Sequence, residues 1–389
     1  MGLKRVRDRI WTCASEGQCI GKGPTNPFGG PSAPLGLCAP HEKFKSEDYS
    51  PRGRLYLCRL LNQNLIEPSD ELVKVAYTDT TCGFCDEVCT LKPLEAFRAL
   101  REELIERGVP PPTPNRIQME NVRDKHNVFG AKPEDRSRWS QDLQLSKKGD
   151  VLYFAGCYAS YRQPKTAIAT IKILQVADID VSTLGNEEWC CGFPLSWNGY
   201  RNLSTDLMKR NIDSIKDTGA STVVFSCAEC YRTFKLDYKE LLGRLPFQVV
   251  HFAEYAKDLM DKGKISLSEF KTRVTYHDPC FLGRHLKIYD EPRKLIKNIP
   301  GIEFVEMERN GRWAFCCGSG GGIVQSAYPE FSGWSGRIRL TEAKKVSDVL
   351  ITACPKCVEN LTIASTTEGI NITIYDLPIF LDKVLQTTH

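Results

Sequence analysis

The sequence predicts an α/β protein that consists of two tandem units, preceded by a mainly helical, cysteine-rich region. Two observations support this prediction: one cysteine pattern occurs twice at nearly constant spacing, and short apolar strands alternate with helices around each copy. Because strands that alternate with helices usually form parallel sheets, each unit is expected to have a Rossmann-like fold. The near-constant spacing further predicts that pseudo-two-fold symmetry relates the two units, with their sites facing each other.

In each unit the cysteine pattern is a single cysteine, an adjacent Cys-Cys pair followed by glycine, and a C-x-x-C motif. Ten of the 17 cysteines belong to it: Cys157, Cys190, Cys191, Cys227 and Cys230, then Cys280, Cys316, Cys317, Cys354 and Cys357. Corresponding cysteines are offset by 123, 126 and 127 residues, so the two copies differ only by small insertions. We interpret this repeat as the result of duplication of one metal-binding unit.

The elements of each unit follow the same order. In the first unit the expected strands are 151–157, a short one near Val181, and 221–227, and the expected helices are 166–177, 203–219 and 228–238. In the second unit the expected strands are 273–280, 302–307 and 346–354, and the expected helices are 293–299, 336–346 and 355–361. The cysteines follow strand ends, which is the sheet edge where α/β proteins bind ligands. Each C-x-x-C also opens a helix, where the helix dipole favours thiolate over thiol.

The chain divides into four segments on this basis. Residues 1–108 hold the other seven cysteines, and residues 109–149 have none and are rich in proline and charge, which predicts a linker or an arm. The repeated units are predicted at 151–270 and 271–389. A length of 389 residues is enough for two or three domains with cores of their own.

Composition excludes several classes of protein. A net charge of +4 without a long basic block argues against nucleic-acid binding. We find no apolar run of about 18 residues, so no transmembrane span is expected. Seventeen cysteines in such a chain indicate metal ligation rather than disulfides. We therefore expect a cytoplasmic protein, either free or held at the membrane periphery through a partner subunit.

Five cysteines per unit exceed the four ligands that zinc takes, and two adjacent cysteines chelate one tetrahedral ion poorly. An adjacent pair suits an iron–sulfur cluster, in which neighbouring iron atoms can each take one thiolate. A zinc-stabilised scaffold is the least favoured alternative. The Gly318–Gly322 turn could instead cradle a phosphate, but it lacks the spacing of a dinucleotide-binding motif.

The repeated pattern resembles the CCG domain, which occurs twice in the catalytic subunit of heterodisulfide reductase of methanogens, and the resemblance covers about 151–389. It implies that each set of five cysteines holds one noncubane [4Fe-4S] cluster, and that the two clusters flank a disulfide and cleave it reductively. All ten ligand positions of that family are filled in this sequence.

Residues 1–108 resemble the ferredoxin-like module that precedes CCG domains in fused members of this family, on the residues 50–57 and 81–89. The resemblance implies one or two cubane [4Fe-4S] clusters, with candidate ligands Cys13, Cys19, Cys38, Asp79, Cys82, Cys85 and Cys89. The sequence departs from the family pattern, because Asp79 and Thr90 replace a cysteine and a proline, and the first run of cysteines is stretched. Cys58 lies in an apolar stretch and is expected to be a packing residue.

Two histidines near the second set are candidate catalytic residues. His277 and His285 flank Cys280 and could donate a hydrogen bond to sulfur or a proton to a departing thiolate, or could simply cap a turn.

Two functions are compatible with these features. The first is an iron–sulfur oxidoreductase subunit that reduces a disulfide, or oxidises thiols, with electrons from a flavoprotein or ferredoxin-type partner. The alternative is an electron-transfer subunit that links a flavoprotein dehydrogenase to a quinone or a membrane cytochrome subunit and has no small-molecule substrate. Ten intact ligand positions favour the first.

Overall fold

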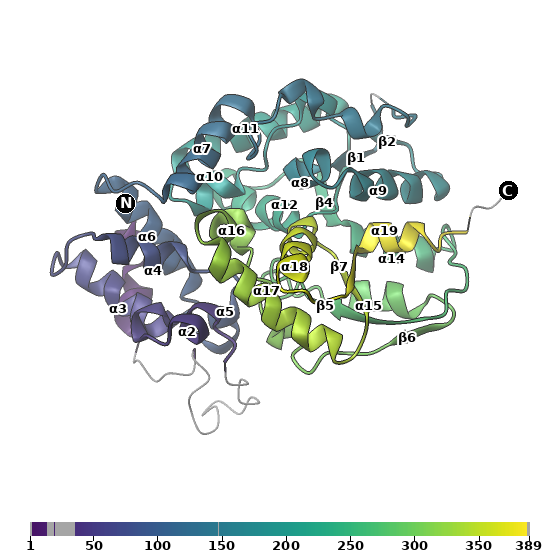
Figure 1. The fold of residues 1–389 in the computed structure, drawn as a ribbon. Coiled ribbons are helices and arrows are strands. Elements are labelled where there is room, and N and C mark those ends of the chain that lie inside the picture. Colours follow the sequence, from purple (N-terminus) through teal and green to yellow (C-terminus); the bar gives the residue numbers. More distant parts are fainter. Residues whose placement is uncertain (1, 14–18, 20–35, 147, 387–389) are drawn as a thin grey trace.

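The computed structural model describes residues 2–13, 19, 36–146 and 148–386 (Figure 1). Two parallel four-stranded sheets form its centre, with the strand orders β2-β1-β3-β4 and β6-β5-β7-β8. The first sheet consists of β1 Val151–Phe154, β2 Val181–Ser182, β3 Thr222–Phe225 and β4 Gln248–His251. The second consists of β5 Thr272–His277, β6 Ile302–Phe304, β7 Val349–Thr352 and β8 Thr373–Asp376.

Helices follow the strands in both halves and cover the sheets. The first half contains α8 Gly156–Tyr161, α9 Pro164–Val176, α10 Phe193–Trp197, α11 Arg201–Thr218, α12 Ala228–Arg232, α13 Lys239–Leu242 and α14 Phe252–Asp261. The second contains α15 Asp290–Lys297, α16 Ile323–Ala327, α17 Pro329–Lys344, α18 Pro355–Thr367 and α19 Leu377–Asp382. The apolar strand β1 is buried along its whole length, as expected for a parallel strand with both faces covered.

The predicted α/β class is therefore confirmed, and the predicted strands lie at β1, β2, β3, β5, β6 and β7. The fourth strand of each sheet, β4 and β8, was not predicted. Both sheets have the same strand order. The Rossmann-like pairing and the pseudo-two-fold relation stay predictions.

The two halves are interlocked through their last helices. The C-terminal helix α19 packs against α9 of the first half, and α14 packs against α15 of the second (Figure 1). Each half therefore buries part of its apolar surface against the other.

The N-terminal region lies at one end of the molecule (Figure 1). Its helices are α1 Arg7–Thr12, α2 Ala39–Phe44, α3 Pro51–Asn62, α4 Asp70–Tyr77, α5 Phe84–Val88 and α6 Leu94–Glu106. Local sequence explains their starts: the Ser50 hydroxyl accepts from the Gly53 N–H at the start of α3, and the Ser69 hydroxyl accepts from the Leu72 N–H at the start of α4. No strand occurs within residues 2–13, 19 and 36–108, in agreement with a mainly helical region. The glycine- and proline-rich stretch before Cys38 lies, for residues 20–35, outside the described residues.

The segment 109–149, predicted to be a linker or an arm, contains the helix α7 Thr113–Lys125. The Asn115 amide of this helix is buried and donates to the Asn198 side chain at 2.9 Å and to the Ile323 carbonyl at 3.2 Å. The segment thus contacts both halves.

None of the helices in the described part of the chain combines the length and the apolar character that crossing a membrane requires.

Candidate functional site

The first set of five cysteines gathers at the carboxyl ends of β1 and β3. Cys157 lies in α8 directly after β1, the pair Cys190–Cys191 precedes α10, and Cys227 is the residue before α12. All five are buried. One cavity is lined by all of them, together with Val128, Tyr158, Pro194, Glu229 and Lys356.

The second set occupies the corresponding places after β5 and β7. Cys354 is the residue before α18, and the Sγ atoms of Cys317 and Cys357 are 3.5 Å apart. Cys280 and Cys316 are also hydrogen-bonding neighbours. Four members of this set are buried, whereas Cys280 is half-buried. The structure thus brings together the five cysteines of each predicted set.

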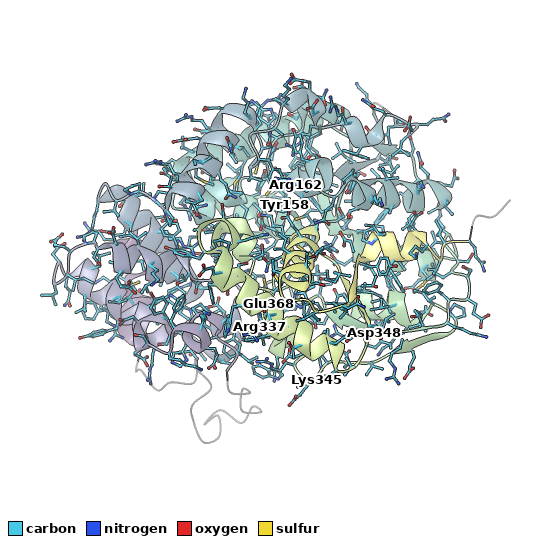
Figure 2. The ribbon with its side chains drawn as sticks, in the orientation of Figure 1. Tyr158, Arg162, Arg337, Lys345, Asp348 and Glu368 are labelled. Atoms are coloured by element: carbon cyan, nitrogen blue, oxygen red, sulfur yellow. The ribbon has the colours of Figure 1, made fainter. Side chains whose placement is uncertain are left out.

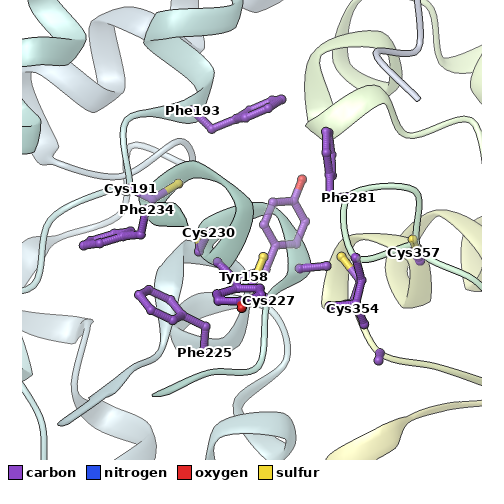
Figure 3. Packing of buried hydrophobic residues seen from close by; sticks show 14 of the residues in the cluster. Tyr158, Cys191, Phe193, Phe225, Cys227, Cys230, Phe234, Phe281, Cys354 and Cys357 are labelled. Atoms are coloured by element: carbon purple, nitrogen blue, oxygen red, sulfur yellow. The ribbon is translucent and has the colours of Figure 1, made fainter. Parts of the chain in front are cut away.

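The two sets meet at one point. The thiols of Cys227 and Cys354, the first cysteines of the two C-x-x-C motifs, adjoin each other and interact electrostatically. In Figure 3 these two side chains face each other, and Phe193 and Phe281 lie above them in the view. The sites therefore adjoin across the boundary between the two halves.

A buried ion pair joins the same two motifs. Glu229 and Lys356 each hold the third position of a C-x-x-C motif, and the Lys356 ammonium pairs with the Glu229 carboxylate. Lys356 also donates to the Gly321 carbonyl at 2.6 Å and lies 4.9 Å from the ring centre of Tyr158, a residue of α8 that Figure 2 labels. This pair was not predicted from the sequence, although opposite charges at equivalent motif positions were a visible signal.

The thiols within each set differ in acidity. Hydrogen bonds from the thiols of Cys190 and Cys230 lower the pKa of Cys191 to about 5. In the second set, hydrogen bonds from Cys316 and Cys357 hold the pKa of Cys317 well below its usual value. In the second set, hydrogen bonds from Cys227 and Cys357 also hold the pKa of Cys354 well below its usual value. A lowered thiol pKa favours the thiolate, which is the form that ligates a metal.

The donor set fits an iron–sulfur cluster. All ten cysteines are free thiols, and each set offers one more sulfur than a zinc ion takes. The turn after Cys317 requires glycine, because Gly318 has φ +97° and a Cβ atom there would lie 2.5 Å from the Ser332 carbonyl oxygen. The backbone can thus fold tightly around the adjacent pair.

A second buried ion pair supports the first set. Arg136 and Glu188 are 2.8 Å apart, and the Glu188 carboxylate also accepts from the backbone N–H groups of Ala155 and Gly156. Arg136 reaches the Cys157 sulfur at 3.8 Å. Arg136 comes from the segment 109–149, so this segment completes the surroundings of the first set. Neither residue was predicted from the sequence, and no local motif marks them.

His277 lies beside the second set. A ring nitrogen of His277 and the sulfurs of Cys317 and Cys357 lie within 4.8 Å of one another. Burial and the nearby Arg339 lower the pKa of His277 to about 3, so the imidazole is neutral. The Arg339 Nε donates to His277 Nδ1 at 3.0 Å, and this partner was not foreseen from the sequence.

His285 bridges three parts of the chain. Its Nδ1 accepts from Arg232 Nε at 3.2 Å, and its Nε2 contacts the Thr81 carbonyl at 2.9 Å. Burial and Arg232 hold its pKa well below the usual value. Both ring nitrogens are thus engaged in contacts that join the two halves to the loop before Cys82. This arrangement favours a positioning role over proton transfer.

The N-terminal cysteines form two adjoining groups. Cys19 interacts electrostatically with Cys38, Cys89 and Cys13, whereas Cys85 interacts with Cys82 and Cys38, so Cys38 faces both groups. The second group includes Asp79, whose carboxylate accepts from the Thr81 N–H at 2.8 Å and pairs with Arg54 at 3.3 Å. Cys58 lies elsewhere: it is fully buried in α3, in keeping with a packing role.

The second N-terminal group adjoins the second set of five. The thiols of Cys82 and Cys316 are hydrogen-bonding neighbours, and the two residues belong to one buried cluster with Cys38 and Phe84. Arg284 fixes this contact, because its guanidinium donates to the carbonyls of Cys82 and Ala314, each at 2.7 Å. The contacts therefore connect the second N-terminal group to the second set, and the second set to the first.

Comparison with known proteins identifies the repeated unit. The model of the cysteine-rich domain family CCG matches residues 151–235 and 274–362. A subunit of the dihydromethanophenazine:CoB–CoM heterodisulfide reductase of Methanosarcina mazei is 34% identical over 381 residues, which cover 94% of this chain and 91% of that protein. The same subunit of the Methanosarcina acetivorans enzyme is 33% identical and covers 96% of this chain and 93% of its own. A subunit of the fumarate reductase (CoM/CoB) of Methanothermobacter marburgensis is 31% identical over 81% of this chain and 64% of its own.

Proposed function

Because this chain belongs to the family of CCG-domain subunits of heterodisulfide reductase and carries the CCG domain twice, we propose that it is the disulfide-reducing subunit of an iron–sulfur oxidoreductase complex. The observation that carries the proposal is the contact of Cys227 with Cys354, which places the two sets of five thiols side by side. A disulfide bound at this boundary would have one cysteine set beside each of its two sulfur atoms.

The reaction is the reductive cleavage of R–S–S–R′. Two electrons and two protons enter, the S–S bond breaks, and the thiols RSH and R′SH leave. The electrons come from a flavoprotein or ferredoxin-type partner subunit, and a membrane cytochrome subunit is a further candidate partner. The ten repeat cysteines are the proposed ligands of two noncubane [4Fe-4S] clusters, which supply one-electron transfer when bound.

The N-terminal cysteines are the proposed ligands of one or two cubane clusters. One group is Cys13, Cys19 and Cys89, and the other is Cys38, Cys82 and Cys85 with Asp79 as a candidate fourth ligand. Cys13, Cys19 and Cys89 are half-buried, whereas Cys38, Cys82 and Cys85 are buried. A donor subunit would therefore dock beside the first group, and the second group would pass electrons inward.

The other residues of the site hold it together and exclude water. The ion pairs Arg136–Glu188 and Glu229–Lys356 fix the turns that carry the cysteines. Phe193 and Phe281 pack edge to face at 5.1 Å beside the boundary of the two sets. In a rigid environment without water, electrostatic interactions with the charged ligands are screened less than in water.

The test is anaerobic purification followed by iron and sulfide counts and by mixing with disulfides. Two [4Fe-4S] clusters contain about eight irons per chain, so fully loaded protein with fewer would refute the two-site proposal. We expect the reduced protein to be oxidised by a disulfide with release of two thiols. A Cys227→Ser variant should lose this reaction, whereas Cys58→Ala should retain it.

The alternative function, an electron-transfer subunit without a small-molecule substrate, predicts no oxidation of the reduced protein by disulfides. A protein that exchanges electrons with a flavoprotein but is not oxidised by any of a panel of disulfides would be an electron-transfer subunit without its own substrate.

A further inference from the structure

The two cysteine sets differ in the residue that ends the strand before the single cysteine. His277 ends β5 and Phe154 ends β1, and the two residues occupy equivalent places: each stands three residues before the single cysteine of its set. Each also pairs in register with the residue that stands two before the C-x-x-C motif, Thr352 for His277 and Phe225 for Phe154. The first set therefore has a phenyl ring where the second has an imidazole.

Arg339 shows the same asymmetry. The Ser335 hydroxyl of α17 donates to the Cys316 carbonyl at 2.8 Å, and the Asn211 amide of α11 donates to the Cys190 carbonyl at 2.9 Å. These two residues thus hold equivalent places on equivalent helices. One turn further along lie Arg339 in the second half and Ile215 in the first, both fully buried.

The contact between Arg339 and His277 determines where the imidazole carries its proton. A guanidinium is only a donor, so Nδ1, which it contacts at 3.0 Å, must be an acceptor, and the proton must be on Nε2. Arg339 is itself fixed, because its Nη1 donates to the Arg309 carbonyl at 2.6 Å and to Glu342 at 2.9 Å. His277 Nε2 is buried and has no hydrogen-bond partner among the described residues. A buried donor without a partner is rare in folded proteins, and a ring nitrogen of His277 lies within 4.8 Å of the sulfurs of Cys317 and Cys357.

We propose that His277 donates its Nε2–H to a ligand sulfur of the second site, that Arg339 is the residue that positions it, and that this pair makes the reduction potential of the second site different from that of the first. A hydrogen bond to a ligand sulfur stabilises the reduced, more negative state, so it raises the potential. The imidazole donates in both oxidation states and transfers no proton. The inference depends on the proposed function only in that the second set must hold a cluster.

The experiment is an EPR-monitored redox titration of the anaerobically loaded full-length protein and its variants. His277→Phe places in the second site the residue that the first site has, and we expect one midpoint potential to move to a lower value while the others stay unchanged. His277→Gln keeps an N–H donor and should restore part of the shift. Arg339→Met leaves the imidazole free to change tautomer and should lower the same midpoint. Phe154→Leu is the matched control, because it changes the equivalent position of the first site.

A second experiment tests the hydrogen bond without measuring a reduction potential. With ¹⁵N-labelled histidine, pulsed EPR should detect a nitrogen coupling to the reduced protein, and this coupling should disappear in His277→Phe. The inference is overturned if His277→Phe keeps its iron and all its midpoints, if all midpoints move together, or if the nitrogen coupling persists. If His277→Phe does not load with iron, an unchanged midpoint in Arg339→Met overturns it. Wild-type protein that takes up no clusters would instead refute the proposed function.

Discussion

Arg136 provides a quantitative test of how the first cysteine set is supported. Arg136 and Glu188 are 2% and 3% exposed, and the Glu188 carboxylate accepts four hydrogen bonds. Two come from Arg136, at 2.8 and 3.2 Å, and two from the N–H groups of Ala155 and Gly156, at 2.8 and 2.9 Å. Arg136→Met removes the first two and leaves a buried carboxylate without its counter-charge. Hydrogen bonds to charged groups contribute about 1.5–3 kcal/mol each. Removing one partner of a buried pair costs about 3–5 kcal/mol in all.

The assay is hydrogen exchange of the peptide that contains Ala155 and Gly156, because their N–H groups bond to Glu188 and report its local stability. A loss of about 3–5 kcal/mol corresponds to roughly 150- to 4,500-fold faster exchange of these amides. Combining Arg136→Met with Glu188→Gln removes the uncompensated charge and should restore part of the protection. Arg138→Met is the matched control: Arg138 is 70% exposed and pairs with Asp135, so its loss should change stability by less than about 1 kcal/mol. Equal exchange rates in Arg136→Met and Arg138→Met would refute this reasoning.

Three further predictions concern other parts of the chain. Cys58→Ala should leave the iron count unchanged, because Cys58 is buried in α3 apart from the other cysteines, whereas Cys85→Ala should lower the count; equal iron in both variants would remove Cys85 from the ligands. Burial lowers the pKa of His251 to about 4, so between pH 6.5 and 4 the unfolded chain binds a proton that the folded chain does not. The free energy of unfolding should therefore decrease by up to about 3 kcal/mol as the pH is lowered from 6.5 to 4. His251→Asn, which keeps a capping acceptor before α14, should make the urea midpoint less dependent on pH in this window. Gly321→Ala should lower the melting temperature strongly and cost more than about 2 kcal/mol, because its Cβ would collide with Phe193 and Glu229, whereas Gly185→Ala, also at positive φ but in open space, should cost about 1 kcal/mol; similar losses would contradict the steric explanation.

Local sequence patterns predicted the elements that carry the cysteines, because both signals are short-range. An apolar run that ends on a cysteine predicts a strand, and a C-x-x-C motif followed by a periodic segment predicts a helix, as at Cys354 and α18. The strands β4 and β8 were missed because each begins with an exposed polar residue and ends with a titratable one, so neither has a strong apolar run. Both strands follow the helix that begins at a C-x-x-C motif, but this shared position is recognised only when the strand order of the two sheets is known.

The supporting residues of the site depend on contacts between distant segments. Arg136 and Glu188 are 52 residues apart, and Arg339 and His277 are 62 apart. An arginine that neutralises a buried carboxylate and one that lies on the surface look alike in a sequence. Composition and periodicity therefore predict the candidate ligands but not the residues that support them. The segment 109–149 shows the same limit: its polar composition predicted a linker or an arm, but did not indicate that Arg136 within it is among the most buried arginines.

The place of the N-terminal region has a consequence for how the site is assembled. This region precedes the first half in the chain, yet its second cysteine group contacts the second half, through Cys82 and Cys316. Arg284 secures this contact from the second half and is 6% exposed, so its charge is buried only when the carbonyls of Cys82 and Ala314 are both in place. His285 adds a link to Thr81 from the same turn. The contacts of the second N-terminal group are therefore completed by the second half, through the turn that carries Arg284 and His285.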